Sequence, residues 1–307
     1  MLFKMNSRIM SLSQSSKNEL LMYTVSKGSE EELKDILKYT SPNIFAPNTP
    51  LAMAANDGNY NKVEILLLAG ADPNLIKGRY GSIALCNAVF NCDIKIMKLL
   101  FSHGANPDLG GYESPLTIVS EKSCFEAVQL LVENGADVKQ SRIGGEALAA
   151  AMKKLHSNES TSSMKVQYAI IIEYLFSLDV NPNVPWWGTS YEPPIVTAVG
   201  VEDVKTVKRL ISIGATPNTS NEWGYTPLFL AVSRRNYELV KLLLDAGANI
   251  NLTAAENPES PLDLAIRRND TRIINLLDDY FPSLNIFSLR CVWKHRIDIS
   301  SIPPTLL

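Results

Sequence analysis

The chain has 307 residues, of which 46% are hydrophobic and 20% are charged, a composition typical of a folded protein with a large buried surface. Its formal net charge is −3, from 29 basic and 32 acidic residues, so no dominant basic face for nucleic acid is indicated. The sequence contains no run of about 18 apolar residues, and we therefore predict no membrane partner.

The N-terminal part of the chain has two predicted segments. Residues 1–16 are polar and are expected to form a mobile leader. They contain no apolar run of signal-peptide length. Residues 17–37 place Leu20, Leu21 and Val25 at helical spacing, and we predict two short helices joined at Lys27 and Gly28.

From Asn48 onward, one sequence phrase recurs about every 33 residues. It is clearest at Thr49–Asn74 and at Thr226–Asn251. Each copy opens with a Thr-Pro-Leu turn that can cap a helix, and a glycine ends the second helix in the left-handed conformation. Such a repeat predicts a stack of helix pairs without a single enclosed core. Residues 17–37 lack the Thr-Pro-Leu opening, as expected of a capping unit.

The helix-ending glycines mark the units and also reveal one irregular unit. In that unit, Asp179 stands where the others have glycine, and Lys153–Gln167 adds about ten residues between the two predicted helices. Its Ser, Thr and Asn content predicts a surface loop, with a regulatory site as the alternative. The glycines are Gly70, Gly104, Gly135, Gly214 and Gly247.

These motifs resemble the ankyrin repeat family over roughly residues 48–279. The resemblance implies an all-α ankyrin repeat solenoid, built from helix-turn-helix units with β-turn fingers. It gives one array over residues 17–281, with an N-terminal cap and about seven repeats. The repeats begin near Asn48, Tyr80, Tyr112, Gly144, Tyr191, Gly224 and Glu259.

The resemblance further implies that the fingers bind a protein target. Aromatic residues and arginine bury much area in interfaces, so those in the predicted fingers are the candidates for target binding. The segment Asn183–Pro194 holds the densest cluster, although one of its tryptophans could instead cover the adjoining helices. The candidates are Tyr80, Tyr112, Arg142, Trp186, Trp187, Tyr191 and Trp223.

The last segment, Pro282–Leu307, departs from the repeat and resembles a SOCS box, with a short helical first part. Ser283 and Leu284 match the family's lead-in, with Ser288 at its usual cysteine position. A second register would use Phe287 and Cys291; the first is preferred because Pro282 also matches. The resemblance implies that the helix binds elongin B/C and that the Ile-Pro segment meets a cullin. The alternative is a C-terminal helix that only caps the apolar end of the last repeat. The elongin-binding candidates are Leu284, Ser288 and Val292, and the cullin-binding candidates are Ile302 and Pro303.

The four cysteines show no zinc-ligand spacing, so no metal site is predicted. We predict that they are small buried side chains in a reducing compartment, the cytoplasm or alternatively the nucleus. They are Cys86, Cys92, Cys124 and Cys291.

The leading functional hypothesis is a substrate-recognition adaptor of a cullin-type ubiquitin ligase, in an intracellular signalling pathway. The alternatives are an ankyrin scaffold or inhibitor that recruits no ligase, and a pathogen effector that mimics a host adaptor. We expect no enzyme activity and no cofactor, because the sequence lacks GxSxG, HExxH and GxxxxGK[ST] motifs.

Overall fold

The computed structural model describes residues 9–44, 48–76, 83–111, 113–139, 142–185, 192–254 and 259–280. In these ranges the regular elements are helices, which confirms the predicted all-α repeat fold. The helices are α2 (Gln14–Lys27), α3 (Glu30–Leu37), α4 (Pro50–Asn56), α5 (Tyr60–Leu68), α6 (Ala84–Phe90), α7 (Ile94–Ser102), α8 (Pro115–Glu121), α9 (Phe125–Glu133), α10 (Arg142–Leu155), α11 (Ser162–Phe176), α12 (Pro194–Gly200), α13 (Val204–Ser212), α14 (Pro227–Ser233), α15 (Tyr237–Asp245), α16 (Pro261–Arg267) and α17 (Thr271–Tyr280).

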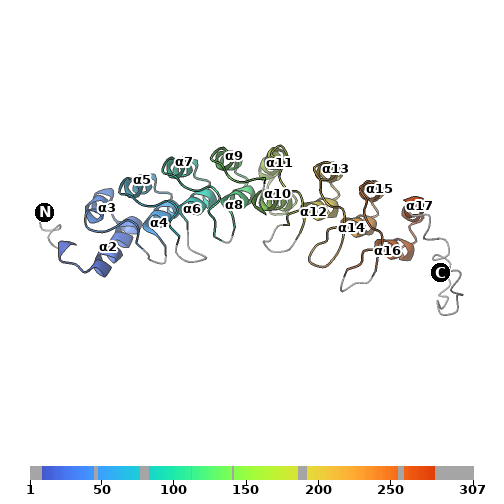
Figure 1. Ribbon diagram of the computed structural model, residues 1–307, viewed down its shortest axis with the longest axis horizontal. Helices are drawn as coiled ribbons and strands as arrows, with labels where there is room; N and C mark the ends of the chain where they lie inside the picture. Colours follow the sequence, from blue (N-terminus) through green and yellow to red (C-terminus); the bar gives the residue numbers. More distant parts are fainter. Residues whose placement is uncertain are drawn as a thin grey trace. The chain divides into compact units, whose positions relative to one another are not determined.

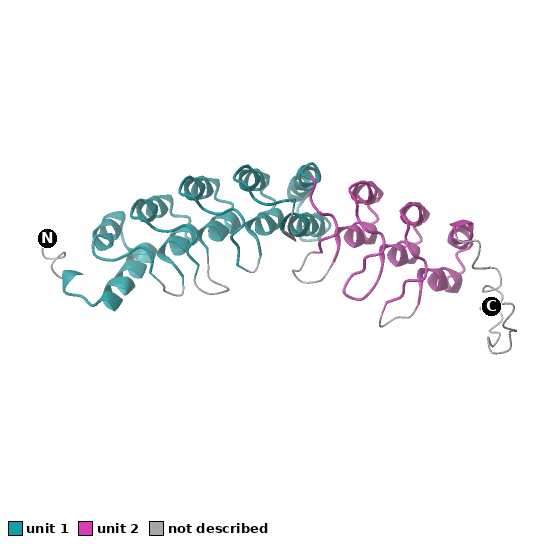
Figure 2. Cartoon of the chain, in the orientation of Figure 1, with its two compact units in different colours: residues 1–178 teal, residues 179–307 magenta. Residues whose placement is uncertain are grey.

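The chain forms two compact units, residues 1–178 and 179–307 (Figure 2). In the first unit, helices α2, α4, α6, α8 and α10 pack in sequence as one row, and α3, α5, α7, α9 and α11 form a second row against them (Figure 1). In the second unit, α12, α14 and α16 form one row and α13, α15 and α17 the other. The hydrophobic core of each unit therefore lies between its two rows.

The first helix of a pair starts as the Thr-Pro-Leu motif predicts. Thr49 Oγ1 accepts a hydrogen bond from the Ala52 N–H at 3.1 Å, and Thr226 does the same with Phe229 at 3.2 Å. A proline follows each cap, where its missing N–H is not needed. Helix α6 has Ile83 at this position and forms without a side-chain cap, so packing alone suffices there.

The turns confirm the predicted left-handed positions. Gly70 ends α5 with φ +87°, and Asp179 adopts φ +56° at the corresponding place after α11. An aspartate tolerates this conformation better than most side chains, which explains how the irregular unit keeps the repeat geometry.

A side-chain ladder joins neighbouring helix pairs at the end of the second helices. Asn74 Nδ2 donates to the Gly104 carbonyl at 2.8 Å, while Asn74 Oδ1 accepts from the Asn106 N–H at 2.7 Å. Asn43, Asn183 and Asn218 make the same two bonds to the pair that follows each of them. One amide thus satisfies both a helix-terminal carbonyl and a turn N–H of the next pair.

Asp108 is the exception in this ladder. Its carboxylate accepts from the Asp137 N–H at 3.0 and 3.1 Å, but it has no N–H to give to the carbonyl of Gly135. Burial raises the pKa of Asp108, and the nearby Asp137 carboxylate adds to the rise. The joint between the α6–α7 pair and the α8–α9 pair therefore carries a charge where the others carry a neutral amide.

The N-terminal pair is tied to the array by a buried lysine. Lys62 on α5 is only 6% exposed, and its Nζ donates to the carbonyls of Thr24 and Val25 at 3.1 and 2.7 Å. These carbonyls lie in the last turns of α2, where a helix favours a cation.

Two expectations about segment boundaries need correction. Helix α2 begins at Gln14, inside the segment 1–16 that was expected to be a leader. The Ser13 hydroxyl caps this helix by accepting from the Ser16 N–H.

The loop predicted over 153–167 is mostly helix. Helices α10 and α11 have 14 and 15 residues, whereas α8 and α9 have 7 and 9. Thr161 caps α11, so only residues 156–161 connect the two helices.

The cysteines also differ from expectation. Cys86, Cys92 and Cys124 are only partly buried, because two of them stand in the turns between helices and not on the core-facing side of a helix. Cys291 lies outside the described residues.

We predict that Asp108→Asn raises the free energy of unfolding by about 1 kcal/mol at pH 7, because the new amide can donate to the Gly135 carbonyl. The gain should shrink in acid. Since the folded-state pKa of Asp108 is raised, the stability gained from its protonation is present at low pH and is lost as the pH rises through that pKa. Urea unfolding at pH 7 and pH 4 measures both effects.

Asn74→Asp is the matched control for this prediction. It removes the donor to Gly104 and should lower stability at pH 7 by a similar amount, with partial recovery in acid. Equal stability of wild type and Asp108→Asn at pH 7 would contradict the account of the ladder.

Candidate protein-binding surface

The finger between α13 and α14 is a tight turn organised by Asn221. The Asn221 side chain is buried, and its Oδ1 accepts from the Trp223 N–H at 3.2 Å and the Tyr225 N–H at 3.0 Å. The Asn221 N–H donates to the Tyr225 carbonyl at 3.2 Å, and Gly224 takes φ +81°. These contacts fix the backbone on both sides of Trp223 before any partner binds.

The two aromatic residues of this finger have different surroundings. Tyr225 stacks on Phe229 of α14, with ring centroids 4.8 Å apart and an interplanar angle of 17°. Trp223 is 55% exposed. Tyr225 therefore fastens the finger to the array, and Trp223 presents a large rigid surface to solvent, the kind of residue that anchors protein interfaces.

The structure places Arg142 differently from the prediction. It is the first residue of α10 and not part of a finger. The close packing at the start of this helix supplies the reason, since a Cβ on Gly144 would lie 2.2 Å from the Val138 carbonyl oxygen. The glycine allows the helix to start directly against the preceding turn.

The other candidates lie outside the described residues. For the predicted target-binding surface these are Tyr80, Tyr112, Trp186, Trp187 and Tyr191, and for the C-terminal segment they are Leu284, Ser288, Val292, Ile302 and Pro303.

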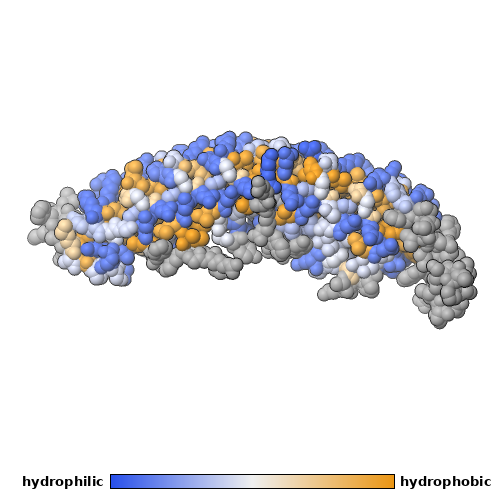
Figure 3. All heavy atoms as spheres, viewed as in Figure 1, coloured by the Kyte–Doolittle hydropathy of each residue, from blue (hydrophilic) through white to orange (hydrophobic). Residues whose placement is uncertain are grey.

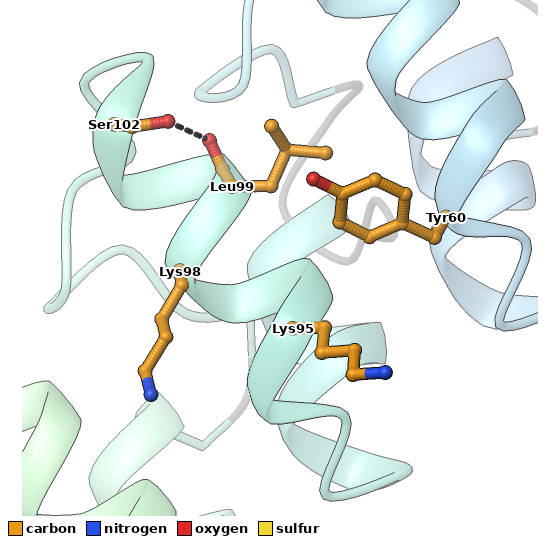
Figure 4. Close-up of a pocket in the computed structure, with 5 residues that line it drawn as sticks. All are labelled: Tyr60, Lys95, Lys98, Leu99 and Ser102. Carbon is orange, nitrogen blue, oxygen red and sulfur yellow. Dashed lines mark hydrogen bonds between the residues drawn. The ribbon is translucent and has the colours of Figure 1, made fainter.

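A groove between α5 and α7 was not anticipated from the sequence. It has a volume of about 670 Å³ and is lined by Tyr60 of α5 with Lys95, Lys98, Leu99 and Ser102 of α7. Figure 4 shows the Tyr60 ring reaching from α5 toward Leu99, and the Ser102 hydroxyl donating to the Leu99 carbonyl at 2.7 Å. Helical spacing places residues 95, 98, 99 and 102 on one face, but only the packed structure brings Tyr60 opposite them.

Exposed apolar residues are spread over the surface. Figure 3 shows hydrophobic residues interspersed with hydrophilic ones on the face of each unit that it presents. Leu68 is the most exposed large hydrophobic residue among the described ones, at 75%. Within the described ranges, no cluster of three or more His, Cys, Asp or Glu could hold a metal ion, and none of the described helices is long and apolar enough to cross a membrane.

Stacked helix pairs with a preformed aromatic finger define a helical-repeat protein that binds other proteins. The family model for ankyrin repeats (three copies) matches residues 21–110, 51–142 and 195–286, more than half of the chain. This chain belongs to the ankyrin repeat family.

Two relatives and one solved structure extend this result. The chain is 34% identical over 144 residues to mouse Ankyrin repeat and SOCS box protein 11, covering 44% of this chain and 43% of that protein. It is 30% identical over 195 residues to the human mitochondrial disaggregase, covering 63% of this chain and 25% of that protein. The chain thus spans less than half of each relative.

The ankyrin repeat domain of Bcl-3 superposes with a TM-score of 0.53 at 22% identity, over 75% of this chain and 98% of that one, and shows the shared fold.

We predict that Trp223→Ala leaves the free energy of unfolding within about 0.5 kcal/mol of wild type, because the side chain is mostly exposed. Asn221→Ala should lower it by about 1–3 kcal/mol, because the N–H groups of Trp223 and Tyr225 lose their acceptor. Urea unfolding of the two variants measures the difference. An equal loss in both would mean that Trp223 packs on the array and is not presented to a partner.

Proposed function

We propose that this protein is a substrate-recognition adaptor of a cullin-type ubiquitin ligase, without catalysis of its own. In this proposal the ankyrin array binds a target protein, and residues 282–307 bind elongin B/C and a cullin. The observation that carries the proposal is the pairing of an ankyrin array with a C-terminal SOCS-box-like segment in one chain. The similarity to a relative named for both modules supports it.

The array supplies the target-binding part of this proposal. Trp223 is held by a turn that is already formed, so binding through it loses little conformational entropy. The groove beside Tyr60 adds an apolar and basic surface on the other unit. Proximity of the bound target to the ligase then accounts for the activity, so the adaptor needs no catalytic residue.

The C-terminal segment supplies the ligase-binding part. Its first half carries Leu284, Ser288 and Val292 at helical spacing, which is suited to a helix that binds in an apolar groove. Ile302 and Pro303 are the proposed cullin contacts. We place the protein in the cytoplasm, with the nucleus as the alternative, because that is where such a complex would act.

Capture of elongin B/C tests the ligase-binding part. The full chain should retain elongin B/C in a pull-down, and Leu284→Asp should lose it, because a buried carboxylate is unfavourable in an apolar groove. Phe287→Asp is the matched variant for the second register. Trp223→Ala should retain elongin, and it should bind a target that depends on this finger about tenfold or more weakly.

The competing function is an ankyrin scaffold or inhibitor that recruits no ligase. Affinity purification with and without residues 282–307 separates the two. Loss of elongin and cullin on truncation, with array partners retained, supports the adaptor. Absence of elongin from the full-chain sample refutes it and leaves the scaffold. Ile302→Ala with Pro303→Ala should lose the cullin while keeping elongin.

A further inference from the structure

Arginines gather in the second unit, where two neighbouring helix pairs turn from their first helix to their second. Residues 233–237 and 266–272 contain five arginines and one acidic residue, Asp270. The α14–α15 and α16–α17 pairs pack directly on each other, so the two turns lie side by side. One of the five, Arg267, is paired with Glu259 at 3.0 Å. The other four are called the arginine cluster here, and they are Arg234, Arg235, Arg268 and Arg272.

Hydrogen bonds between the two turns hold part of this cluster in place. Arg235 Nη2 donates to the Arg268 carbonyl at 3.5 Å, and Arg268 Nη1 donates to the Ser233 carbonyl. These carbonyls stand at the ends of α16 and α14, where a helix leaves acceptors without an internal partner. A guanidinium group has five N–H donors, and each of these bonds uses one of them. The two side chains are therefore positioned by the fold while most of their donors remain for a ligand.

Arg234 and Arg272 have no such role at a helix end, and both are exposed. Arg272 lies over the Tyr237 ring, with its Cζ 4.3 Å from the ring centroid. This contact orients the guanidinium group without neutralising its charge.

The carboxylates around the cluster are engaged elsewhere. Glu238 is paired with Lys208 at 2.8 Å, and Asp270 Oδ1 accepts from the Ile273 N–H at 3.3 Å. Among the described residues, no member of the cluster forms an ion pair with a carboxylate. The chain has a net charge of −3, yet this surface carries four positive charges that the described part of the array does not pair.

We propose that the arginine cluster binds an Asp/Glu-rich segment of a protein partner. A planar guanidinium group can bind a carboxylate through two parallel hydrogen bonds, and four such groups on one surface suit successive carboxylates of an extended chain. The charge complementarity would favour the acidic segment over other parts of a partner's surface. A nucleic acid fits less well, because its charge extends far beyond the cluster and would meet the net negative charge of the chain.

The cluster is distinct from the finger at 221–225. Trp223 precedes the start of α14 and Arg234 follows its end, and a helix of 7 residues is about 10 Å long. The two surfaces therefore lie at opposite ends of this helix. No residue of 282–307 belongs to the cluster, so the proposal holds whether or not the protein recruits a ligase.

Fluorescence anisotropy of a labelled peptide tests the proposal. A peptide in which glutamate alternates with serine should bind the full chain, and its counterpart with glutamine in place of glutamate should bind at least about tenfold more weakly. The affinity for the glutamate peptide should fall as NaCl is added, because salt screens exposed charges. Equal binding of the two peptides would overturn the proposal.

Charge reversal locates the binding surface. Arg234→Glu with Arg272→Glu should weaken binding of the glutamate peptide at least about tenfold, and the fold should tolerate the change because both side chains are exposed. Lys27→Glu with Lys165→Glu is the matched control, since it makes the same change in net charge at exposed positions of the first unit and should bind as wild type does. Unchanged binding by the arginine variant, or an equal loss in the lysine control, would refute the assigned surface.

Two further measurements complete the test. Circular dichroism shows whether each variant is folded, and if the charge-reversed variant is not, Arg234→Gln with Arg272→Gln takes its place, with an expected loss of about threefold or more. A single-stranded oligonucleotide that displaces the peptide, and binds the same arginines at least about tenfold more tightly, would overturn the choice of an acidic protein segment.

Discussion

The joint between successive helix pairs is the constraint on which the rest of this structure depends. A single pair cannot bury its own hydrophobic face, so its stability comes from its neighbours. At the joints made by Asn43, Asn74, Asn183 and Asn218, one amide both donates to a helix-terminal carbonyl and accepts from a turn N–H. Within each unit, both partners belong to the next helix pair, so the bonds restrict how that pair is placed against the one before it. Hydrophobic packing supplies most of the energy, and these directional bonds select one register.

The same constraint explains why the array offers a surface and not an enclosed site. Among the described residues, the finger between α13 and α14 shows how local hydrogen bonds shape such a surface. In the finger at 221–225, one buried asparagine holds the turn while Tyr225 anchors it to α14 and Trp223 faces solvent. Such an arrangement suits a partner with its own extended surface, which agrees with the protein-binding role of the ankyrin fold. The identity of that partner depends on side chains that leave the stack unchanged.

The regular features could be predicted from the sequence because each depends on neighbouring residues. Thr-Pro-Leu starts, glycine ends and the substitute Asp179 are local patterns, and the structure confirms them. The prediction of a surface loop after Lys153 was wrong. The polar residues there include Thr161, which caps α11, and residues that are compatible with a helix. Arg142 was misplaced because Gly144 allows α10 to begin early. The groove beside Tyr60 is lined by residues of two different helix pairs, and no local pattern in the sequence reports such a contact.

Asp108 makes one joint of the array different from the others. It lies at the joint between the α6–α7 and α8–α9 pairs, where its carboxylate accepts from the Asp137 N–H. The four other described ladder joints use neutral amides, which do not titrate. This joint instead uses a carboxylate whose pKa is raised by burial. Its stability should therefore respond to acid while its neighbours do not. A repeat array transmits such a local change mainly to adjacent pairs, so this one joint can be adjusted without unfolding the rest.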